Sequence, residues 1–254
     1  MKIEKKLRIG HMPYLNSEIF YIDLLPGLWD LSKAYPRQMS KLVKSGHLDC
    51  GPLPVVEIFE LEDILIPLDN FGISSNGPAK SVCLFSNLPI KELRGKNISL
   101  TSQSSTSVKL LKLLFSTFWD VLDIQYVDES YPHDAILLIG DNALKQKDNL
   151  SYKYVFDLAE IWKQMTGKPF VFARWVYRKD TDQKLVKKFS ESLSFSVEQS
   201  YAQSFQNIIN KRSSVYMNEN EVKEYVSNFV YMLGDNELQG MKLFRQMLAQ
   251  NSII

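Results

Sequence analysis

Short apolar runs alternate with amphipathic segments along most of the chain, and this alternation predicts an α/β fold with mostly parallel sheets. Most of the runs are four to nine residues long and rich in residues that favour strands. The expected strands lie at 7–12, 64–68, 81–85, 97–100, 124–127, 134–139 and 170–178, and residues 48–56 are expected to form another strand, a turn and the start of another helix. The expected helices lie at 18–25, 36–45, 108–118 and 157–165, and at 184–193, 218–232 and 237–250 in a largely helical C-terminal region.

Several residues mark where these helices begin and end. Asn16 or Ser17 is placed to cap the first helix, Gly46 to follow the second, and Asp157 to cap the helix before Gly167. Asn218 with Glu221 forms a capping-box pattern. Residues 73–80, with the turn signal Asn-Gly-Pro, are expected to form a loop.

Two extended runs, near 81–86 and 170–178, bracket a strand-rich middle portion of the chain. This arrangement predicts a discontinuous first lobe, residues 1–85 and 176–254, with a second lobe, residues 86–175, inserted into it. The two runs would cross between the lobes as a hinge. One doubly wound sheet would give a similar pattern, so that alternative stays open.

The composition excludes few classes of protein and is typical of a soluble globular protein. The 254 residues are 45% hydrophobic and 23% charged, with a formal net charge of +1, which gives no support for binding to nucleic acid or to a membrane surface. The N-terminal stretch MKIEKKLRIG has no apolar signal core, and no run is long enough to span a bilayer. We therefore expect a cytoplasmic protein. Cys50 and Cys83 lie in apolar runs and are expected to be buried thiols.

The sequence does not predict a metal or nucleotide site. His11, His47 and His133 are far apart, without ligand-like spacing to a cysteine or carboxylate. The chain has no Walker loop, no GxGxxG after a strand and no GxSxG elbow.

Polar turns follow three of the expected strands, where the ligand of an open α/β sheet is bound. A hydroxyl-rich turn that opens a helix offers N–H groups, side-chain donors and the positive end of the helix dipole, which suit a carboxylate or phosphate. Helix capping is the alternative function for each turn. The turns would converge on one cleft, and their candidate binding residues are Tyr14, Leu15 and Asn16; Ser104, Ser105, Thr106 and Ser107; and Gly140 and Asp141.

Six segments together resemble the chorismate dehydratases of menaquinone biosynthesis by the futalosine route. They are RIGHMPYLNS, GPAKSVCLFS, SSTSV before a Leu-rich helix, DAILLIGD, DLAEIWKQMTG and PFVFARWVYR, in order over residues 7–178. The resemblance implies a two-lobed periplasmic-binding-protein-like (type II) fold with a central cleft. It also implies a metal-free and cofactor-free enzyme acting on chorismate, a small dianion. A non-catalytic protein that binds a small carboxylate is the alternative.

The resemblance also implies roles for individual residues. Asn16 would contact the departing hydroxyl or the developing anion, and Ser81 would orient the substrate or relay a proton. The serines and threonine at 104–107 would hold a carboxylate. No His or carboxylate lies in YLNS, KSV or SSTS, so the substrate's own enolpyruvyl carboxylate is the hypothetical proton acceptor.

Other positions depart from the family or allow two interpretations. Glu18-Ile19 stands where the family usually has a proline, Thr101-Ser102-Gln103 replaces small or acidic residues, and Arg174 replaces valine. Asp141 is a base, an anchor or only a turn residue. Trp175 either stacks on the substrate ring, as a candidate binding residue, or packs in the core. Arg178 either attracts the dianion or is a solvated strand end.

Overall fold

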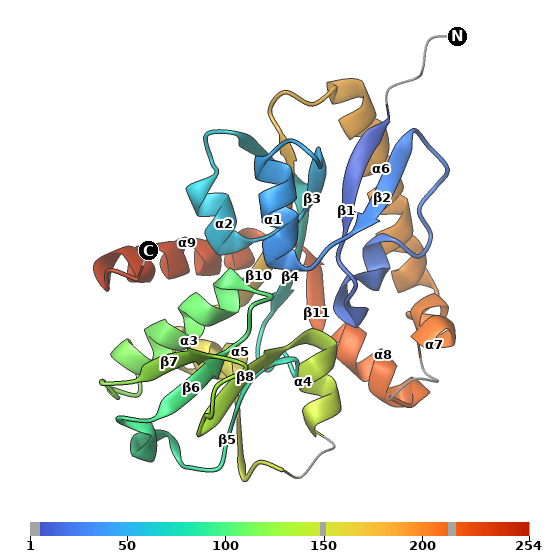
Figure 1. Ribbon diagram of the computed structural model, residues 1–254. Helices are drawn as coiled ribbons and strands as arrows, with labels where there is room; N and C mark the ends of the chain where they lie inside the picture. Colours follow the sequence, from blue (N-terminus) through green and yellow to red (C-terminus); the bar gives the residue numbers. More distant parts are fainter. Residues whose placement is uncertain (1–5, 148–150, 213–216, 254) are drawn as a thin grey trace. The chain divides into compact units, whose positions relative to one another are not determined.

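The computed structural model describes residues 6–147, 151–212 and 217–253, which form a mixed α/β structure (Figure 1). The chain divides into two compact units. Unit 1 contains the described residues up to Ile73 and those from Ala173 to Leu233, and unit 2 contains Ser74–Phe172 and the described residues from Gly234 onward. The predicted α/β class and the discontinuous organisation of the chain are both present.

Unit 1 is built on a six-stranded sheet of order β11-β4-β10-β3-β1-β2. β1 pairs in parallel with β2 and β3, whereas β10 is antiparallel to β3. The sheet is therefore mixed, and the expectation of mostly parallel pairing is wrong where β10 joins β3. The strands are β1 (Leu7–His11), β2 (Trp29–Lys33), β3 (Cys50–Pro54), β4 (Leu65–Ser75), β10 (Phe170–Arg178) and β11 (Phe229–Met232).

Helices cover both faces of this sheet. An added Cβ on Gly51 would lie 2.8 Å from the Met39 sulfur, so helix α1 packs closely over that glycine. Pro52 follows Gly51 in β3, so it faces the other side of the sheet, and its partner in β10 is Trp175. On that side the Trp175 ring contacts Phe189 of α6. The helical elements of unit 1 are η1 (Leu15–Phe20, a 3-10 helix), α1 (Pro36–Lys44), α2 (Val55–Glu60), α6 (Gln183–Ala202), α7 (Gln206–Arg212) and α8 (Glu219–Ser227).

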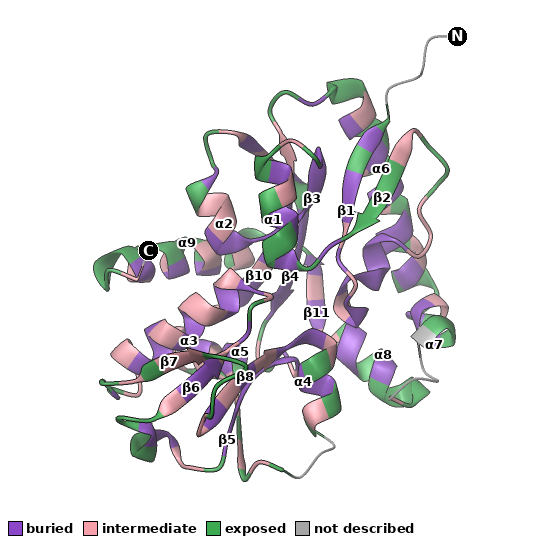
Figure 2. Cartoon of the chain, in the orientation of Figure 1, coloured by how far each residue is buried: buried purple, intermediate pink, exposed green. Residues whose placement is uncertain are grey.

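Unit 2 contains a five-stranded sheet of order β7-β6-β8-β5-β9. β6 is parallel to β7 and β8, while β5 is antiparallel to β8 and β9. Figure 2 shows β5 buried along its whole length, as expected for a strand with helices on both faces. The strands are β5 (Val82–Ser86), β6 (Asn97–Leu100), β7 (Gln125–Asp128), β8 (Ala135–Ile139) and β9 (Tyr154–Asp157).

Apolar side chains of unit 2 pack in two clusters. Cys83 and Phe85 of β5 pack with Ala143 on one side, and the Trp162, Phe170 and Phe244 rings form an edge-to-face cluster elsewhere in the unit. The helical elements are η2 (Ile90–Leu93, 3-10), α3 (Ser105–Thr117), α4 (Gly140–Lys147), α5 (Leu158–Thr166) and α9 (Asp235–Gln250).

Several predicted helix ends are confirmed. Gly46 has φ of +73° just after α1, Asp157 caps α5, and the Asn218–Glu221 capping box opens α8. The first predicted helix is wrong in type and extent. It is the 3-10 helix η1, and Tyr14 stands at its N-cap position without a side-chain cap. Strands β2, β9 and β11 were not predicted, and β4 continues through the first three residues, 73–75, of the expected loop at 73–80.

The predicted lobe boundaries also need correction. β5 lies wholly in unit 2, so it is not a crossing strand; the chain changes units within β4, between Ile73 and Ser74, and within β10. Residues from Gly234 onward belong to unit 2 rather than to the first lobe. The physical reason is the packing of α9, whose Phe244 contacts Trp162 of α5 and whose Gly240 leaves room for the Pro169 carbonyl.

No helix in the described ranges combines the length and the apolar character needed to cross a membrane.

Candidate active site

One edge of the unit 2 sheet gathers most of the predicted site residues. The C-terminal ends of the parallel strands β6 and β8 lie at this edge, and the antiparallel β5 begins there. Ser104–Ser107 follow β6, Gly140 and Asp141 follow β8, and Ser81 precedes β5. The topology therefore brings together seven residues that are scattered over sixty positions of the sequence.

Ser81 is 1% exposed and is held through its backbone. The Gly140 N–H donates to the Ser81 carbonyl over 2.8 Å, directly beside the first β5–β8 pair, Val82 with Ile139. Gly140 adopts φ of +56°, in the left-handed region that glycine accepts without steric cost. Replacement of Gly140 by a residue with a Cβ would therefore strain the bond that orients Ser81.

The start of α3 has the geometry expected of a carboxylate site. The Ser104 hydroxyl caps the helix by accepting the Ser107 N–H over 3.3 Å, and the Ser107 hydroxyl donates to Ser104 over 3.2 Å. Thr106 is fully buried. The buried Ser105 hydroxyl has no hydrogen-bond partner among the described residues. A buried polar atom without a partner is costly, so a ligand that binds Ser105 would remove this cost.

In unit 1 the turn after β1 carries Tyr14, Leu15 and Asn16. Tyr14 and Leu15 are buried, and the Tyr14 ring lies 5.8 Å from that of Tyr35. The Ser17 hydroxyl donates to the carbonyls of Met12 and Tyr14, at 2.6 and 2.7 Å, so Ser17 locks the turn from within rather than capping a helix. The Asn16 Oδ1 atom is buried, and no described residue donates a hydrogen bond to it.

Long-range contacts, most of them from side chains that the motif analysis did not single out, hold η1 and the end of β1 in place. The Tyr21 hydroxyl donates to Gly10 and accepts the Met12 N–H, so it secures the end of β1. The Ser196 hydroxyl, from α6, donates to the Ile19 carbonyl over 2.8 Å. Glu18 is 2% exposed and forms an ion pair with Lys211 over 2.9 Å. These contacts join residues up to 193 positions apart, which no local pattern reveals.

Trp175 is a core residue of unit 1, so its interpretation as a packing residue is the one that the structure supports. Its side chain is fully buried, and its ring lies 5.5 to 5.8 Å from the rings of Phe20, Tyr21 and Phe189. The ring supports η1 from within the core, and its candidate role in substrate binding stays a prediction.

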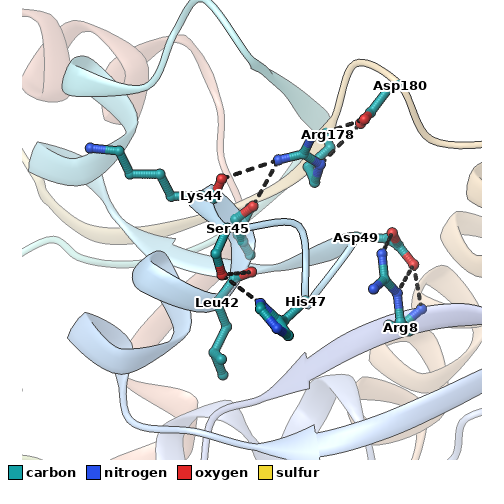
Figure 3. A network of polar contacts seen from close by, with 9 residues as sticks. Arg8, Leu42, Lys44, Ser45, His47, Asp49, Arg178 and Asp180 are labelled. Carbon is teal, nitrogen blue, oxygen red and sulfur yellow. Dashed lines mark hydrogen bonds and ion pairs between the residues drawn. The ribbon is translucent and has the colours of Figure 1, made fainter.

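Arg178 has a structural role at the end of α1 (Figure 3). Its guanidinium donates to the Val43 and Lys44 carbonyls, over 3.0 and 3.4 Å, and it also pairs with Asp180. Cationic donors at the last carbonyls of a helix stabilise that terminus. The same network contains the Arg8–Asp49 pair at the start of β1, whereas Asn16 follows the other end of that strand.

Arg174, which departs from the family pattern, also acts within unit 1. Its guanidinium donates to the Asp69 carbonyl over 3.2 Å, and the Ser190 hydroxyl donates to the Asp69 carboxylate. Asp69 has φ of +46°, which is unusual for a residue with a side chain. Arg174 and Ser190 therefore support a strained position of β4.

The predicted buried thiols are found, and they are poor nucleophiles. Cys50 and Cys83 are free and buried, and burial raises the pKa of each thiol well above its ordinary range. Burial likewise raises the pKa of the Tyr21 hydroxyl, so Tyr21 stays neutral at physiological pH. These three groups therefore cannot serve as bases near neutrality.

The predicted site residues belong to both units. Asn16, Tyr14 and Leu15 lie in unit 1, whereas Ser81, the hydroxyl turn at 104–107, Gly140 and Asp141 lie in unit 2. Within unit 2 they share one sheet edge. That the two sets meet in one cleft stays a prediction.

Comparisons with known proteins agree with the resemblance seen in the sequence. A model of the family described as menaquinone biosynthesis matches residues 7–250. The chorismate dehydratase of Thermus thermophilus is 27% identical over 241 residues, which is 85% of each chain.

Solved structures show the fold. A protein from Archaeoglobus fulgidus superposes with a TM-score of 0.80 at 16% identity, covering 98% of both chains. The periplasmic aliphatic sulphonate binding protein of Escherichia coli gives a TM-score of 0.64 at 14% identity, covering 99% of this chain and 94% of that one. The fold is thus the periplasmic-binding-protein-like fold that the sequence predicted.

Proposed function

Because the chain belongs to the menaquinone biosynthesis family, we propose that it is a chorismate dehydratase, a hydro-lyase that converts chorismate to 3-[(1-carboxyvinyl)oxy]benzoate and water. The observation that carries this proposal is the family match over residues 7–250. We place the reaction in the cytoplasm, whose reducing conditions suit the free thiols of Cys50 and Cys83.

The reaction depends more on how the protein binds and orients the substrate than on acid–base groups of the protein. Chorismate is a dianion whose ring becomes aromatic on loss of water. The ring carboxylate acidifies the proton on the carbon that bears the enolpyruvyl ether; this C–H bond breaks and the neighbouring hydroxyl leaves. The protein must bind two carboxylates, stabilise charge as it spreads into one of them, and hold the ring in the reactive pose.

The start of α3 is suited to one carboxylate of the substrate. Its N–H groups and helix dipole favour negative charge, and the free Ser105 hydroxyl can donate to a carboxylate oxygen. We assign Ser104, Thr106 and Ser107 to the same contact region.

Asn16 and Ser81 are assigned the contacts closest to the reacting atoms. In the amide of Asn16, the nitrogen donates to the departing hydroxyl or the developing anion, and the unpartnered Oδ1 accepts from the substrate hydroxyl. Ser81, whose backbone is held by Gly140, orients the ring or relays a proton.

The proton acceptor is assigned to the substrate itself. No His or carboxylate lies in YLNS, KSV or SSTS, which favours the enolpyruvyl carboxylate as the group that removes the ring proton. The thiols and Tyr21 stay protonated near neutrality and do not supply a base. This hypothesis requires a kcat that does not follow one enzyme pKa near neutrality. Asp141, at the site edge of unit 2, is the alternative base.

Incubation with chorismate tests the proposed function directly. A dehydratase removes the diene absorbance of chorismate and produces an aromatic product. Thermal stabilisation by chorismate without turnover would instead identify a non-catalytic binding protein. Neither stabilisation nor turnover would contradict both alternatives.

Substitution of Asn16 by alanine should abolish most of the turnover while leaving the fold intact. We expect kcat to fall by about 10²- to 10³-fold, the usual effect of removing a donor to a developing anion. The melting temperature should change by less than about 2 °C, because Oδ1 has no described partner to lose. Steady-state kinetics and thermal unfolding measure both quantities.

Asn218 provides the matched control. Its side chain caps α8 and accepts the Glu221 N–H over 3.0 Å, so N218A should cost about 1 kcal/mol of unfolding free energy and leave kcat unchanged. If the fall in kcat of N16A were explained by a comparable loss of unfolding free energy, Asn16 would be a structural residue.

A further inference from the structure

The carboxylate of Asp157 joins two parts of unit 2. Its Oδ1 atom accepts the Ala159 and Glu160 N–H groups, at 3.0 and 3.2 Å, and so caps α5. The same Oδ1 accepts the Ala79 N–H over 3.1 Å, and Oδ2 accepts the Lys80 N–H over 2.6 Å. A helix cap needs only the first pair of bonds, so the second pair indicates an additional role.

The second pair of bonds holds an unfavourable backbone conformation. Lys80 has φ of +63°, in the left-handed region that is sterically unfavourable for a residue with a side chain. A charge-assisted hydrogen bond from its N–H to Asp157 offsets that cost. Strain of this kind persists only where the surroundings impose it, and it is concentrated at functional sites.

The strained residue directly precedes Ser81. On its other side Ser81 is fixed by the Gly140 N–H and by the start of β5, where Val82 pairs with Ile139. Asp157 thus completes the restraint of Ser81 from the N-terminal side.

We propose that Asp157 is a positioning residue, which sets the left-handed turn at Lys80 and thereby the orientation of Ser81 toward the substrate. This inference rests on the proposed function, in which Ser81 contacts chorismate.

Replacement of Asp157 by serine separates the two roles of the carboxylate. Serine is a good N-cap and keeps the bond to the start of α5, but its side chain is one carbon shorter than needed to reach the Lys80 N–H. We expect kcat for chorismate to fall by about 10- to 100-fold, with a change in KM of less than about threefold, because misorientation affects the reacting pose more than uniform binding.

Asp182 is the matched control for the cap itself. It caps α6 in unit 1 through the Lys184 and Leu185 N–H groups, over 2.8 and 3.4 Å. D182S therefore makes the same chemical change at a helix start and should leave kcat unchanged. Equal kcat values for D157S and D182S, with wild-type turnover intact, would overturn the inference.

A second substitution tests whether Asp157 acts through the conformation of Lys80. Glycine accepts positive φ without steric cost, so K80G removes the strain that Asp157 offsets. We expect D157S to reduce kcat at least threefold less in the K80G background than in the wild-type background, a coupling that a double-mutant cycle measures. Additive losses would show that Asp157 does not act through the turn.

Amide hydrogen exchange tests the role of Asp157 without measuring turnover of chorismate. In D157S the amides of residues 79–81 should exchange at least about tenfold faster than in wild type, while those of the first turn of α5 keep their protection. Unchanged exchange at 79–81 would overturn the inference even if chorismate is turned over. Faster exchange at 79–81 in D157S, together with a wild-type protein that does not convert chorismate, would reject the proposed function alone.

Discussion

The two units hold their predicted site residues in different ways. In unit 2, Ser81 and Gly140 are joined backbone to backbone at the sheet edge, and Ser104 with Ser107 closes the first turn of α3. In unit 1, the turn that carries Asn16 depends on side chains that reach it from other parts of the chain. Apart from the Asp157 carboxylate, which reaches residues 79 and 80 from the start of α5, the unit 2 half of the candidate site is therefore a product of local and sheet geometry. The unit 1 half depends on long-range side-chain packing.

This difference predicts different responses to substitution. At the unit 2 edge, the removal of a ligand-facing hydroxyl should change substrate binding and leave the fold intact, because the backbone bonds remain. Below η1, the removal of a supporting side chain should reduce stability first. The comparison fails if the two classes of substitution give the same result.

Of the two classes of substitution, we expect the larger effect from the loss of the Ser105 hydroxyl in unit 2. In S105A the hydroxyl assigned to a substrate carboxylate is lost, and we expect KM for chorismate to rise by about 10- to 100-fold, as for a hydrogen bond to a charged group. The unfolding free energy should change by less than about 0.5 kcal/mol, because the hydroxyl has no described partner in the free protein. Steady-state kinetics and urea unfolding measure these values.

Ser116 is the control on the same helix. Its hydroxyl donates to the Leu113 carbonyl in the last turns of α3, away from the polar end. S116A should leave KM unchanged. A KM for S105A that equals that of S116A would remove the start of α3 from the site.

Lys211 tests the support of η1 in unit 1. In K211M the carboxylate of Glu18, 2% exposed, loses the Lys211 ammonium at 2.9 Å, and we expect a loss of about 1–2 kcal/mol in unfolding free energy. This is less than for a fully buried pair, because half of the Lys211 side chain is exposed. Urea unfolding of the single variants, E18Q and the double variant gives the coupling energy of the pair.

The Lys6–Asp30 pair is a close match for this experiment. Its nitrogen–oxygen distance is also 2.9 Å and its lysine is 51% exposed, but its carboxylate is 61% exposed rather than buried. K6M should therefore cost less than about 0.5 kcal/mol. A K211M effect no larger than that of K6M would contradict the anchoring of η1 by this ion pair.

Much of unit 2 was predictable because its signals are local. A strand, a run of small polar residues and an amphipathic segment are enough to place Ser104 at the start of α3, and Asp157 and Gly167 mark both ends of α5. Parallel strands place such turns at one edge, which groups Gly140 with the α3 turn, whereas Ser81 is a candidate only through the family resemblance, because it precedes the antiparallel β5.

Unit 1 was less predictable because its decisive contacts are not local. The segment after β1 resembles a capped α-helix, but the Ser17 hydroxyl bonds to carbonyls within the turn and Ser196 binds the Ile19 carbonyl from 177 residues away. The result is a 3-10 helix. Trp175 likewise became a core residue because Phe20 and Phe189 surround it, a fact that only tertiary packing decides.

The smallest expected effect is that of pH on turnover. If the substrate carboxylate accepts the proton, kcat should vary by less than about twofold between pH 6.5 and 8.5, since no essential enzyme base then titrates in this range. The groups with raised pKa do not interfere: the thiols of Cys50 and Cys83 and the Tyr21 hydroxyl are protonated below their ordinary values of 9.0 and 10.0, and burial moves each pKa upward, away from neutrality. D141N distinguishes the alternative, because loss of a base at Asp141 would lower kcat by about 10²- to 10⁴-fold. A bell-shaped or sigmoidal profile near pH 7 that disappears in D141N would identify Asp141 as the proton acceptor. A flat profile in both proteins would favour the enolpyruvyl carboxylate of the substrate.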